Sequence, residues 1–215
     1  MKTFITCAFL ALGSLFVQAQ NDTTAQKLLD EVSAKTQSYK NISISFSYEL
    51  NNPSADVKRS TEGALIMEGE KYVLEFLGIK RVCDGTTIWD LFIDDEEGTI
   101  SNVTDQDDES ISPKDLFSIY KKGFKYKMGE PTTIDGVSFE TVELFPENLD
   151  AIEYSKIILS IDAKKKQIVA LKEMGNNGTI TNYIIKSMKS NQILTPSSFS
   201  FDTTLYTDFY MQDMR

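Results

Sequence analysis

The sequence has 215 residues, a formal net charge of −10, no histidine and two cysteines. The lack of histidine excludes serine–histidine hydrolases, histidine general bases and histidine-ligated zinc. The acidic balance disfavours a broad basic surface for nucleic acid or for anionic lipid.

Residues 1–19 have the features of an export signal. Lys2 precedes an apolar run from Phe4 to Phe16, and Ala19 fits the small-residue rule for cleavage. The run is too short to span a bilayer, so we expect an exported protein without stable membrane insertion. Cleavage removes Cys7 and leaves Cys83 alone, which rules out an internal disulfide. We therefore expect one domain, residues 20–215, stabilised by a core that buries roughly 70% of the unfolded surface.

The mature chain is expected to begin with a helix over residues 23–39. Thr23 and Gln26 have capping-box spacing, and apolar residues from Ala25 to Val32 share one face. Residues 42–50, ISISFSYEL, then alternate between large apolar and polar side chains. This period of two predicts a half-buried antiparallel strand.

Most of the remaining chain has the pattern of short strands separated by tight turns. Asp84-Gly85, Asp135-Gly136 and Asn177-Gly178 suit the positive φ angles of hairpin turns. We expect a meander of about eleven strands, which could close into a barrel, stack as a sandwich or remain unclosed and be plugged by helices. The expected strands after the first are 63–69, 71–78, 80–83, 86–94, 98–103, 124–129, 137–146, 155–162, 167–174, 179–188 and 198–203.

A second helix is expected to interrupt the strands. Ser112 is its candidate N-cap, Pro113 its first residue and Gly123 its end. Bulky apolar residues, Leu116, Phe117 and Tyr120 among them, give this helix a face that would cover the sheet.

Candidate chemistry is sparse. The acidic runs at 94–98 and 105–110 could serve glycoside hydrolysis or calcium binding, but they are more typical of solvated turns. Cys83 has no histidine to activate it, so it is interpreted as a packing residue. No catalytic residue, metal site or cofactor site is therefore predicted, and the protein is not expected to be an enzyme.

Several of these segments together resemble the LolA family of periplasmic lipoprotein carriers. The signal peptide, the first helix and the strand ISISFSYEL precede Glu62-Gly63, which opens a long hairpin, and the stretch Asp84-Gly85-Thr86-Thr87-Ile88-Trp89. The mid-chain helix falls where family members carry lid helices. The resemblance covers nearly the whole mature chain in order, and only the stretch from Asp84 to Trp89 is moderately specific.

The resemblance implies a mainly β fold: an unclosed antiparallel half-barrel with a helical lid on its concave face. It implies a monomeric periplasmic carrier that holds the acyl chains of lipoproteins and moves them from an inner-membrane ABC-type complex to an outer-membrane acceptor. Leu116, Phe117 and Tyr120 would form the lid. The residues expected to line the acyl cavity are Ile44, Phe46, Tyr48, Leu65, Met67, Tyr72, Leu74, Phe76, Trp89 and Leu91.

One departure leaves the cargo open. Family members often have Lys-Arg-Pro after the Glu-Gly strand, and the arginine helps to hold the lid closed. This chain has Glu68-Gly69-Glu70 there, and Lys71 cannot offer the same bidentate geometry. The alternatives are a carrier of another lipid and an exported sensing or interaction module on the same fold, similar to regulators of envelope stress.

Overall fold

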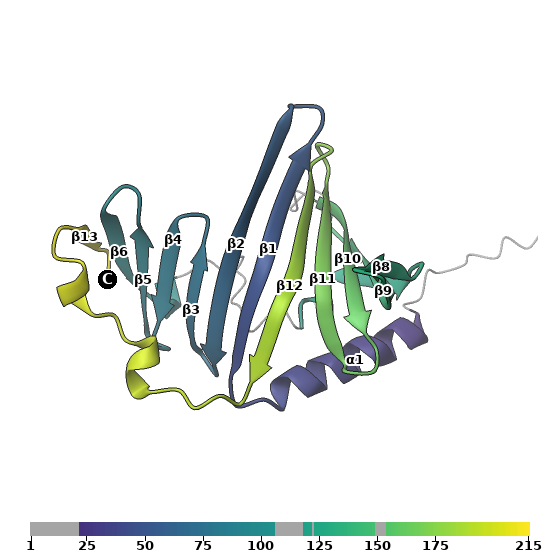
Figure 1. Ribbon diagram of the computed structural model, residues 1–215, viewed down its shortest axis with the longest axis horizontal. Helices are drawn as coiled ribbons and strands as arrows, with labels where there is room; N and C mark the ends of the chain where they lie inside the picture. Colours follow the sequence, from purple (N-terminus) through teal and green to yellow (C-terminus); the bar gives the residue numbers. More distant parts are fainter. Residues whose placement is uncertain (1–21, 106–117, 122, 149–153) are drawn as a thin grey trace, which may run out of the picture.

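The computed structural model describes residues 22–105, 118–121, 123–148 and 154–215 (Figure 1). The helix is α1 (Thr23–Gln37) and the 3-10 helices are η1 (Val103–Asp105), η3 (Ile119–Lys121), η4 (Pro196–Phe199) and η5 (Thr203–Leu205). The first strands are β1 (Ile42–Asn52), β2 (Val57–Glu68), β3 (Lys71–Phe76), β4 (Ile79–Cys83), β5 (Thr87–Phe92) and β6 (Glu97–Asn102). The others are β7 (Phe124–Met128), β8 (Thr132–Ile134), β9 (Val137–Pro146), β10 (Tyr154–Asp162), β11 (Gln167–Gly175), β12 (Ile180–Ser190) and β13 (Tyr210–Asp213). No helix in these ranges is long and apolar enough to cross a membrane.

The strands form one large, unclosed sheet. Their order is β13-β6-β5-β4-β3-β2-β1-β12-β11-β10-β9-β7, and β8 pairs with β9 beside this path. All pairings are antiparallel except that of β13 with β6. The expected mainly β fold with an unclosed antiparallel sheet is confirmed. The described residues form 13 strands, two of which, the short β8 and β13, were not expected from the sequence.

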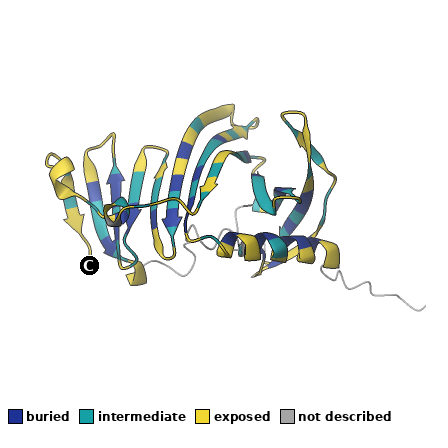
Figure 2. Ribbon diagram, turned by 60° about the horizontal axis from the view of Figure 1, so that its bottom comes forward, coloured by how far each residue is buried: buried dark blue, intermediate teal, exposed yellow. Residues whose placement is uncertain are grey.

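Helix α1 packs on one face of the sheet at the end that contains β7, β9 and β10. Its buried edge and its exposed edge are distinct in Figure 2. The N-cap is Asp22 rather than Thr23, because the Asp22 carboxylate accepts from the amides of Thr24 (2.7 Å) and Ala25 (3.3 Å). The buried residues that α1 and the strands share, here called the helix-side core, are Ala25, Leu28, Leu29, Val32, Tyr120, Phe124, Tyr126, Val142, Leu144, Ile157, Leu159 and Ile161.

Three expected turns join neighbouring strands. The Asp84-Gly85 pair lies between β4 and β5, Asp135-Gly136 between β8 and β9, and Asn177-Gly178 between β11 and β12. Each glycine has a positive φ angle. The Asp84 carboxylate also accepts from the amides of Thr86 (2.9 Å) and Thr87 (2.8 Å), which holds the chain at the start of β5.

The C-terminal segment differs from the sequence expectation. The predicted strand at 198–203 is wrong: these residues form the end of η4, a short link and the start of η5. Phe201 stacks on Trp89 at 5.6 Å between ring centroids, and Tyr206 stacks on Phe201 at 5.4 Å. In Figure 1 the segment runs from β12 past β3 and β4 to β13 at the edge of the sheet. The aromatic side chains of this segment pack on Trp89 of β5. The segment therefore pairs with no described strand here, although its sequence alternates between apolar and polar residues.

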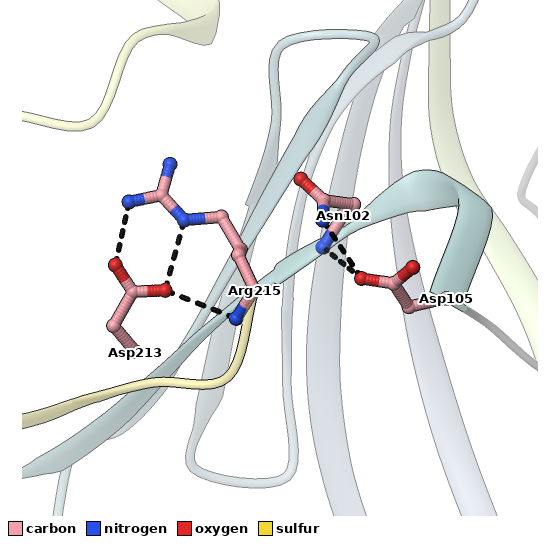
Figure 3. Close-up of polar contacts among 4 residues, drawn as sticks. All are labelled: Asn102, Asp105, Asp213 and Arg215. Atoms are coloured by element: carbon pink, nitrogen blue, oxygen red, sulfur yellow. Dashed lines mark hydrogen bonds and ion pairs between the residues drawn. The ribbon is translucent and has the colours of Figure 1, made fainter.

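Local contacts hold the last residues of the chain. Arg215 donates to Asp213 from its amide and Nε, at 3.1 and 2.9 Å, and Asp105 accepts from Asn102 at the end of β6 (Figure 3). The Arg215 guanidinium lowers the pKa of Asp213 to about 2. Exposed ion pairs of this kind contribute little to stability. Strand β13 is therefore held mainly by its backbone pairing with β6. The Met214 amide extends this pairing by donating to the Ile100 carbonyl at 2.8 Å.

The strand register assigns side chains to two faces of the sheet. Directly opposed residues of neighbouring strands point to the same side. Leu159 of the helix-side core opposes Leu171, which opposes Tyr183, which in turn opposes Tyr48. Tyr48 therefore lies on the face that α1 covers, here called the helix face. The other side of the sheet is called the outer face.

Candidate functional site

The alternating apolar residues of β1 lie on the helix face and continue across its neighbours. Ile44 opposes Leu65 of β2, which opposes Leu74 of β3, and Ile42 opposes Met67 in the same way. Eight of the residues expected to line a cavity lie on this face: Ile44, Phe46, Tyr48, Leu65, Met67, Tyr72, Leu74 and Phe76.

The eight residues differ in how far they are exposed. Five of them, Ile44, Tyr48, Leu65, Met67 and Tyr72, are at most 9% exposed, and all of these except Tyr48 pack together as a second buried core. This central cluster consists of Ile42, Ile44, Leu65, Met67, Tyr72, Cys83 and Ile88. Its members form the floor of the helix face. Phe46, Leu74 and Phe76 are only half-buried and remain available at the surface of the described residues.

An aromatic patch, defined by Phe46, Tyr48, Phe76 and Tyr183, lies beside the central cluster. The Tyr48 ring centroid is 5.0 Å from that of Phe76 and 5.2 Å from that of Tyr183. Phe46 lies 5.4 Å from Phe76 and 6.1 Å from Tyr183. These tilted and edge-to-face contacts hold the rings in fixed orientations. Tyr183, from β12, was not among the residues expected from the sequence, although its alternation with Thr181 and Ile185 could have indicated it.

Gly63 explains the position of the Phe46 ring. Phe46 opposes Gly63 in the β1–β2 register, and a Cβ added to Gly63 would lie 2.3 Å from Phe46 Cζ. The ring therefore lies over the glycine backbone, where no side chain fits. The glycine of the Glu-Gly pair noted in the sequence thus has a packing function in the patch.

We expect Gly63→Ala to displace the Phe46 ring and to lower the free energy of unfolding by about 1–2 kcal/mol. Urea unfolding followed by circular dichroism measures the change. Glu62→Ala is the matched control, because Glu62 is exposed on the outer face of the same strand. Equal stability of Gly63→Ala and the wild type would contradict the close packing of ring and backbone.

Trp89 and Leu91 lie on the outer face, contrary to the sequence expectation. Cys83 opposes Ile88 across the β4–β5 hairpin, so Ile88 and Asp90 lie on the helix face while their neighbours point to the outer face. Leu91 is fully buried there, and Trp89 stacks on Phe201 of the C-terminal segment. Trp89 fluorescence therefore reports on the docking of that segment rather than on direct contact with a ligand on the helix face.

The expected lid is described only in part. Leu116 and Phe117 lie outside the described residues, as does most of the expected helix from Ser112. Tyr120 is described in η3 and belongs to the helix-side core, with 4% of its surface exposed. Its hydroxyl donates to Asp30 of α1 at 2.8 Å, and its ring meets Tyr126 edge-on at 6.0 Å. Tyr120 thus joins the mid-chain segment to α1.

A charged pair on the helix face was missed by the sequence reasoning. Arg81 opposes Asp90 across β4 and β5, and its Nε and Nη2 donate to the two carboxylate oxygens at 2.5 and 2.8 Å. The hydrogen bond to Asp90 raises the pKa of Arg81, and the nearby Tyr72 raises it further. The two charges neutralise each other through bidentate geometry, so this pair positions its strands rather than offering a free charge.

Cys83 is a packing residue. It is 1% exposed, its Sγ lies 3.5 Å from the Glu70 carbonyl oxygen, and burial raises the pKa of its thiol. A thiol with a raised pKa is a poor nucleophile at neutral pH. The acidic run at 94–98 forms the exposed turn between β5 and β6 and the start of β6, while most of the run at 105–110 lies outside the described residues. Within the described part of the chain, no group of carboxylates and cysteines is arranged to hold a metal ion.

Burial alters the titration of two more groups on the helix face. Burial raises the pKa of Glu173, which opposes Thr181 at the end of the face. The pKa of Tyr183 is also raised, first by burial and then by the Glu173 charge. A carboxyl group on this face has therefore lost part of its hydration without gaining an opposite charge.

Two hollows lie on opposite faces of the sheet. One, with a volume of about 200 Å³, lies where α1 meets the start of β1 and is lined by Tyr39, Ile42 and Met67 among others. The second, of about 410 Å³, is on the outer face between the β8 hairpin and the central strands, where Glu143, Lys172 and Asn182 contribute polar groups. Only the first is continuous with the apolar residues of the helix face.

Comparisons with known proteins identify the fold. No protein-family model and no curated protein matches the sequence. An uncharacterized conserved protein from Thermus thermophilus matches with a TM-score of 0.57 and 11% identity, over 88% of this chain and 99% of its own. The lipoprotein LppX from Mycobacterium tuberculosis matches with a TM-score of 0.50 and 14% identity, over 81% and 99%. A LolA superfamily protein from Nitrosomonas europaea also matches, with a TM-score of 0.41 and 10% identity over 82% and 97%. The unclosed-sheet fold that the resemblance implied is shared with the Thermus thermophilus protein and with LppX, and identities this low show the fold alone.

Proposed function

We propose that this protein is a carrier that binds the acyl chains of a lipidated ligand on its helix face. Residues 1–19 direct export and are removed, and residues 20–215 act as one monomeric domain in the periplasm. The ligand is an acylated lipoprotein or a related lipid. It is received from an inner-membrane ABC-type complex and passed to an outer-membrane acceptor. This function needs binding and release but no covalent chemistry.

The aromatic patch is the observation that supports this proposal most directly. Its rings lie on the same face as the buried central cluster, yet Phe46, Phe76 and Tyr183 remain half-buried. Soluble proteins rarely leave neighbouring large aromatic side chains in contact with water without a partner. An acyl chain is a suitable partner, since each buried CH₂ group contributes about 0.8 kcal/mol.

The position of α1 also supports a ligand on this face. The helix covers the part of the sheet formed by β7, β9, β10 and β11, where the helix-side core is closely packed. It does not extend over the aromatic patch, whose residues lie on β1, β3 and β12. Since the sheet is unclosed, an extended chain can reach the patch without unfolding a strand.

The test is to identify what the native protein carries. The full chain is expressed with its signal and purified without detergent, and bound molecules are extracted and identified by mass spectrometry. We expect acylated molecules at close to stoichiometric amounts, and saturable binding of a fluorescent fatty acid after delipidation. A protein that neither retains acylated molecules nor binds the fatty acid saturably would refute the carrier function.

A further inference from the structure

Two residues of opposite charge lie on the helix face, at its end near the tips of the long hairpins. Beyond the aromatic patch, toward the free ends of the long hairpins, Arg59 of β2 opposes Leu50 of β1. Leu50 opposes Thr181 of β12, which opposes Glu173 of β11. These four residues form one row across the sheet, here called the charged row. Three interstrand steps of about 4.8 Å place the outer two Cα atoms roughly 14 Å apart.

Arg59 and Glu173 both act on the hydroxyl of Tyr48, in the next row of the same face. Burial raises the pKa of Tyr48, the Glu173 charge raises it further, and the Arg59 charge lowers it. Electrostatic effects of this kind fall off steeply with distance. The two charges therefore lie within electrostatic range of the same tyrosine hydroxyl, one row beyond the aromatic patch.

Neither charge is neutralised by a neighbour among the described residues. Arg81 and Asp90, also on the helix face, form a bidentate pair, and Glu143 on the outer face binds Lys156 at 2.8 Å. No ion pair or side-chain hydrogen bond of Arg59 or Glu173 is present within the described ranges. Glu173 is half-buried, and burial alone raises its pKa. A cation bound beside it would replace the hydration that the carboxylate has lost.

The charges of Lys58 and Glu49 provide a contrast. Each belongs to the same hairpin, but each is exposed on the outer face. Solvation explains those two side chains fully, and Arg59 of the charged row is exposed to water as well. It does not explain Glu173, which is half-buried on an apolar face and whose charge, in addition to burial, raises the pKa of Tyr48, Tyr154 and Tyr183.

We propose that the charged row binds the head group of a zwitterionic phospholipid whose acyl chain lies along the aromatic patch. The Arg59 guanidinium would bind the phosphate, for which its planar donors are well suited. The Glu173 carboxylate would bind the ammonium group, assisted by the faces of Tyr48 and Tyr183. A phosphoethanolamine head group carries both charges a few bonds apart, and two long side chains that extend toward each other across a Cα separation of roughly 14 Å can reach both. This inference rests on the proposed acyl-chain binding and specifies its ligand class.

The experiment compares two lysophospholipids with the same dodecanoyl chain, kept below their critical micelle concentrations. Lysophosphatidylethanolamine is zwitterionic and lysophosphatidylglycerol is anionic. Each is titrated into the delipidated full-length mature protein by calorimetry. We expect the wild type to prefer the zwitterionic lipid by about fivefold. Glu173→Gln should abolish this preference, and Arg59→Gln should weaken the binding of both lipids by a similar factor.

Matched controls separate a local site from the net charge of the protein. Glu49→Gln and Lys58→Gln make the same charge changes on the outer face of the same hairpin and should leave the preference intact. Loss of the preference in Glu49→Gln, its persistence in Glu173→Gln, or no preference in the wild type would each overturn the inference. If the wild type bound neither lipid, while a fluorescent fatty acid still bound saturably, the head-group inference alone would fail. If nothing bound, the carrier function would fail as well.

Discussion

Phe46→Glu is expected to weaken acyl-chain binding by about 100-fold, an increase of about 2.7 kcal/mol in the binding free energy. Phe46 contacts Phe76 and Tyr183 in the aromatic patch, so its replacement places a carboxylate where the acyl chain would lie. A bound chain would remove water from that carboxylate, and an unpaired charge cannot be desolvated without a large cost. Displacement of a fluorescent fatty acid from the delipidated protein measures the effect.

Ser47→Glu is the control for this substitution. Ser47 is the next residue of β1 and opposes Glu62, so its side chain lies on the outer face. Both variants add one negative charge to the same strand, and only one alters the helix face. We expect Ser47→Glu to bind within about twofold of the wild type. Equal loss of binding in both variants, or no loss in either, would contradict the assignment of acyl-chain binding to the helix face.

Leu29→Ala is expected to lower the free energy of unfolding by about 3 kcal/mol. Leu29 is 1% exposed and lies at the centre of the helix-side core, where α1 meets Val142, Leu144 and Leu159. Its truncation leaves a cavity that neither a rigid helix nor a paired strand can close. Urea unfolding, monitored by the far-ultraviolet circular dichroism of the mature protein, measures the loss.

Lys27→Ala provides the comparison on the same helix. Lys27 is exposed, and alanine has a slightly better helix propensity. We expect its free energy of unfolding to remain within about 0.5 kcal/mol of the wild type. A small effect of Leu29→Ala, similar to that of Lys27→Ala, would mean that α1 contributes little to the stability of the fold. In that case its packing on the sheet would not support a covered binding face.

The first half of the candidate site could be predicted from the sequence because it depends on local alternation. Residues 42–50 change between apolar and polar at every step, and the structure places their apolar set on one face. The Asp-Gly and Asn-Gly pairs likewise identified three turns, since the left-handed conformation that they require is a property of the residues themselves. Gly63 was noted as part of a motif, but its function required the Phe46 ring to be seen above it.

The wrong predictions concern residues whose position depends on how one strand pairs with another or on contacts with a distant part of the chain. Alternation shows which residues of β5 share a side, but the register across the β4–β5 hairpin decides which side that is. This register places Ile88 on the helix face and Trp89 on the outer face. One residue of difference in pairing would exchange the two. The apolar residues after Thr195 were likewise interpreted as a strand, whereas contact with Trp89 holds them as turns.

The sequence by itself determined the fold class, the first helix, the tight turns and the apolar pattern of β1, because each depends on neighbouring residues. It also excluded histidine chemistry through composition alone. Only the tertiary structure decided that Tyr183 completes the aromatic patch and that Trp89 does not belong to it. The same holds for Arg59 and Glu173, which antiparallel pairing brings into one row from distant parts of the chain. Such long-range neighbours are set by register and sheet order, and local sequence patterns contain neither.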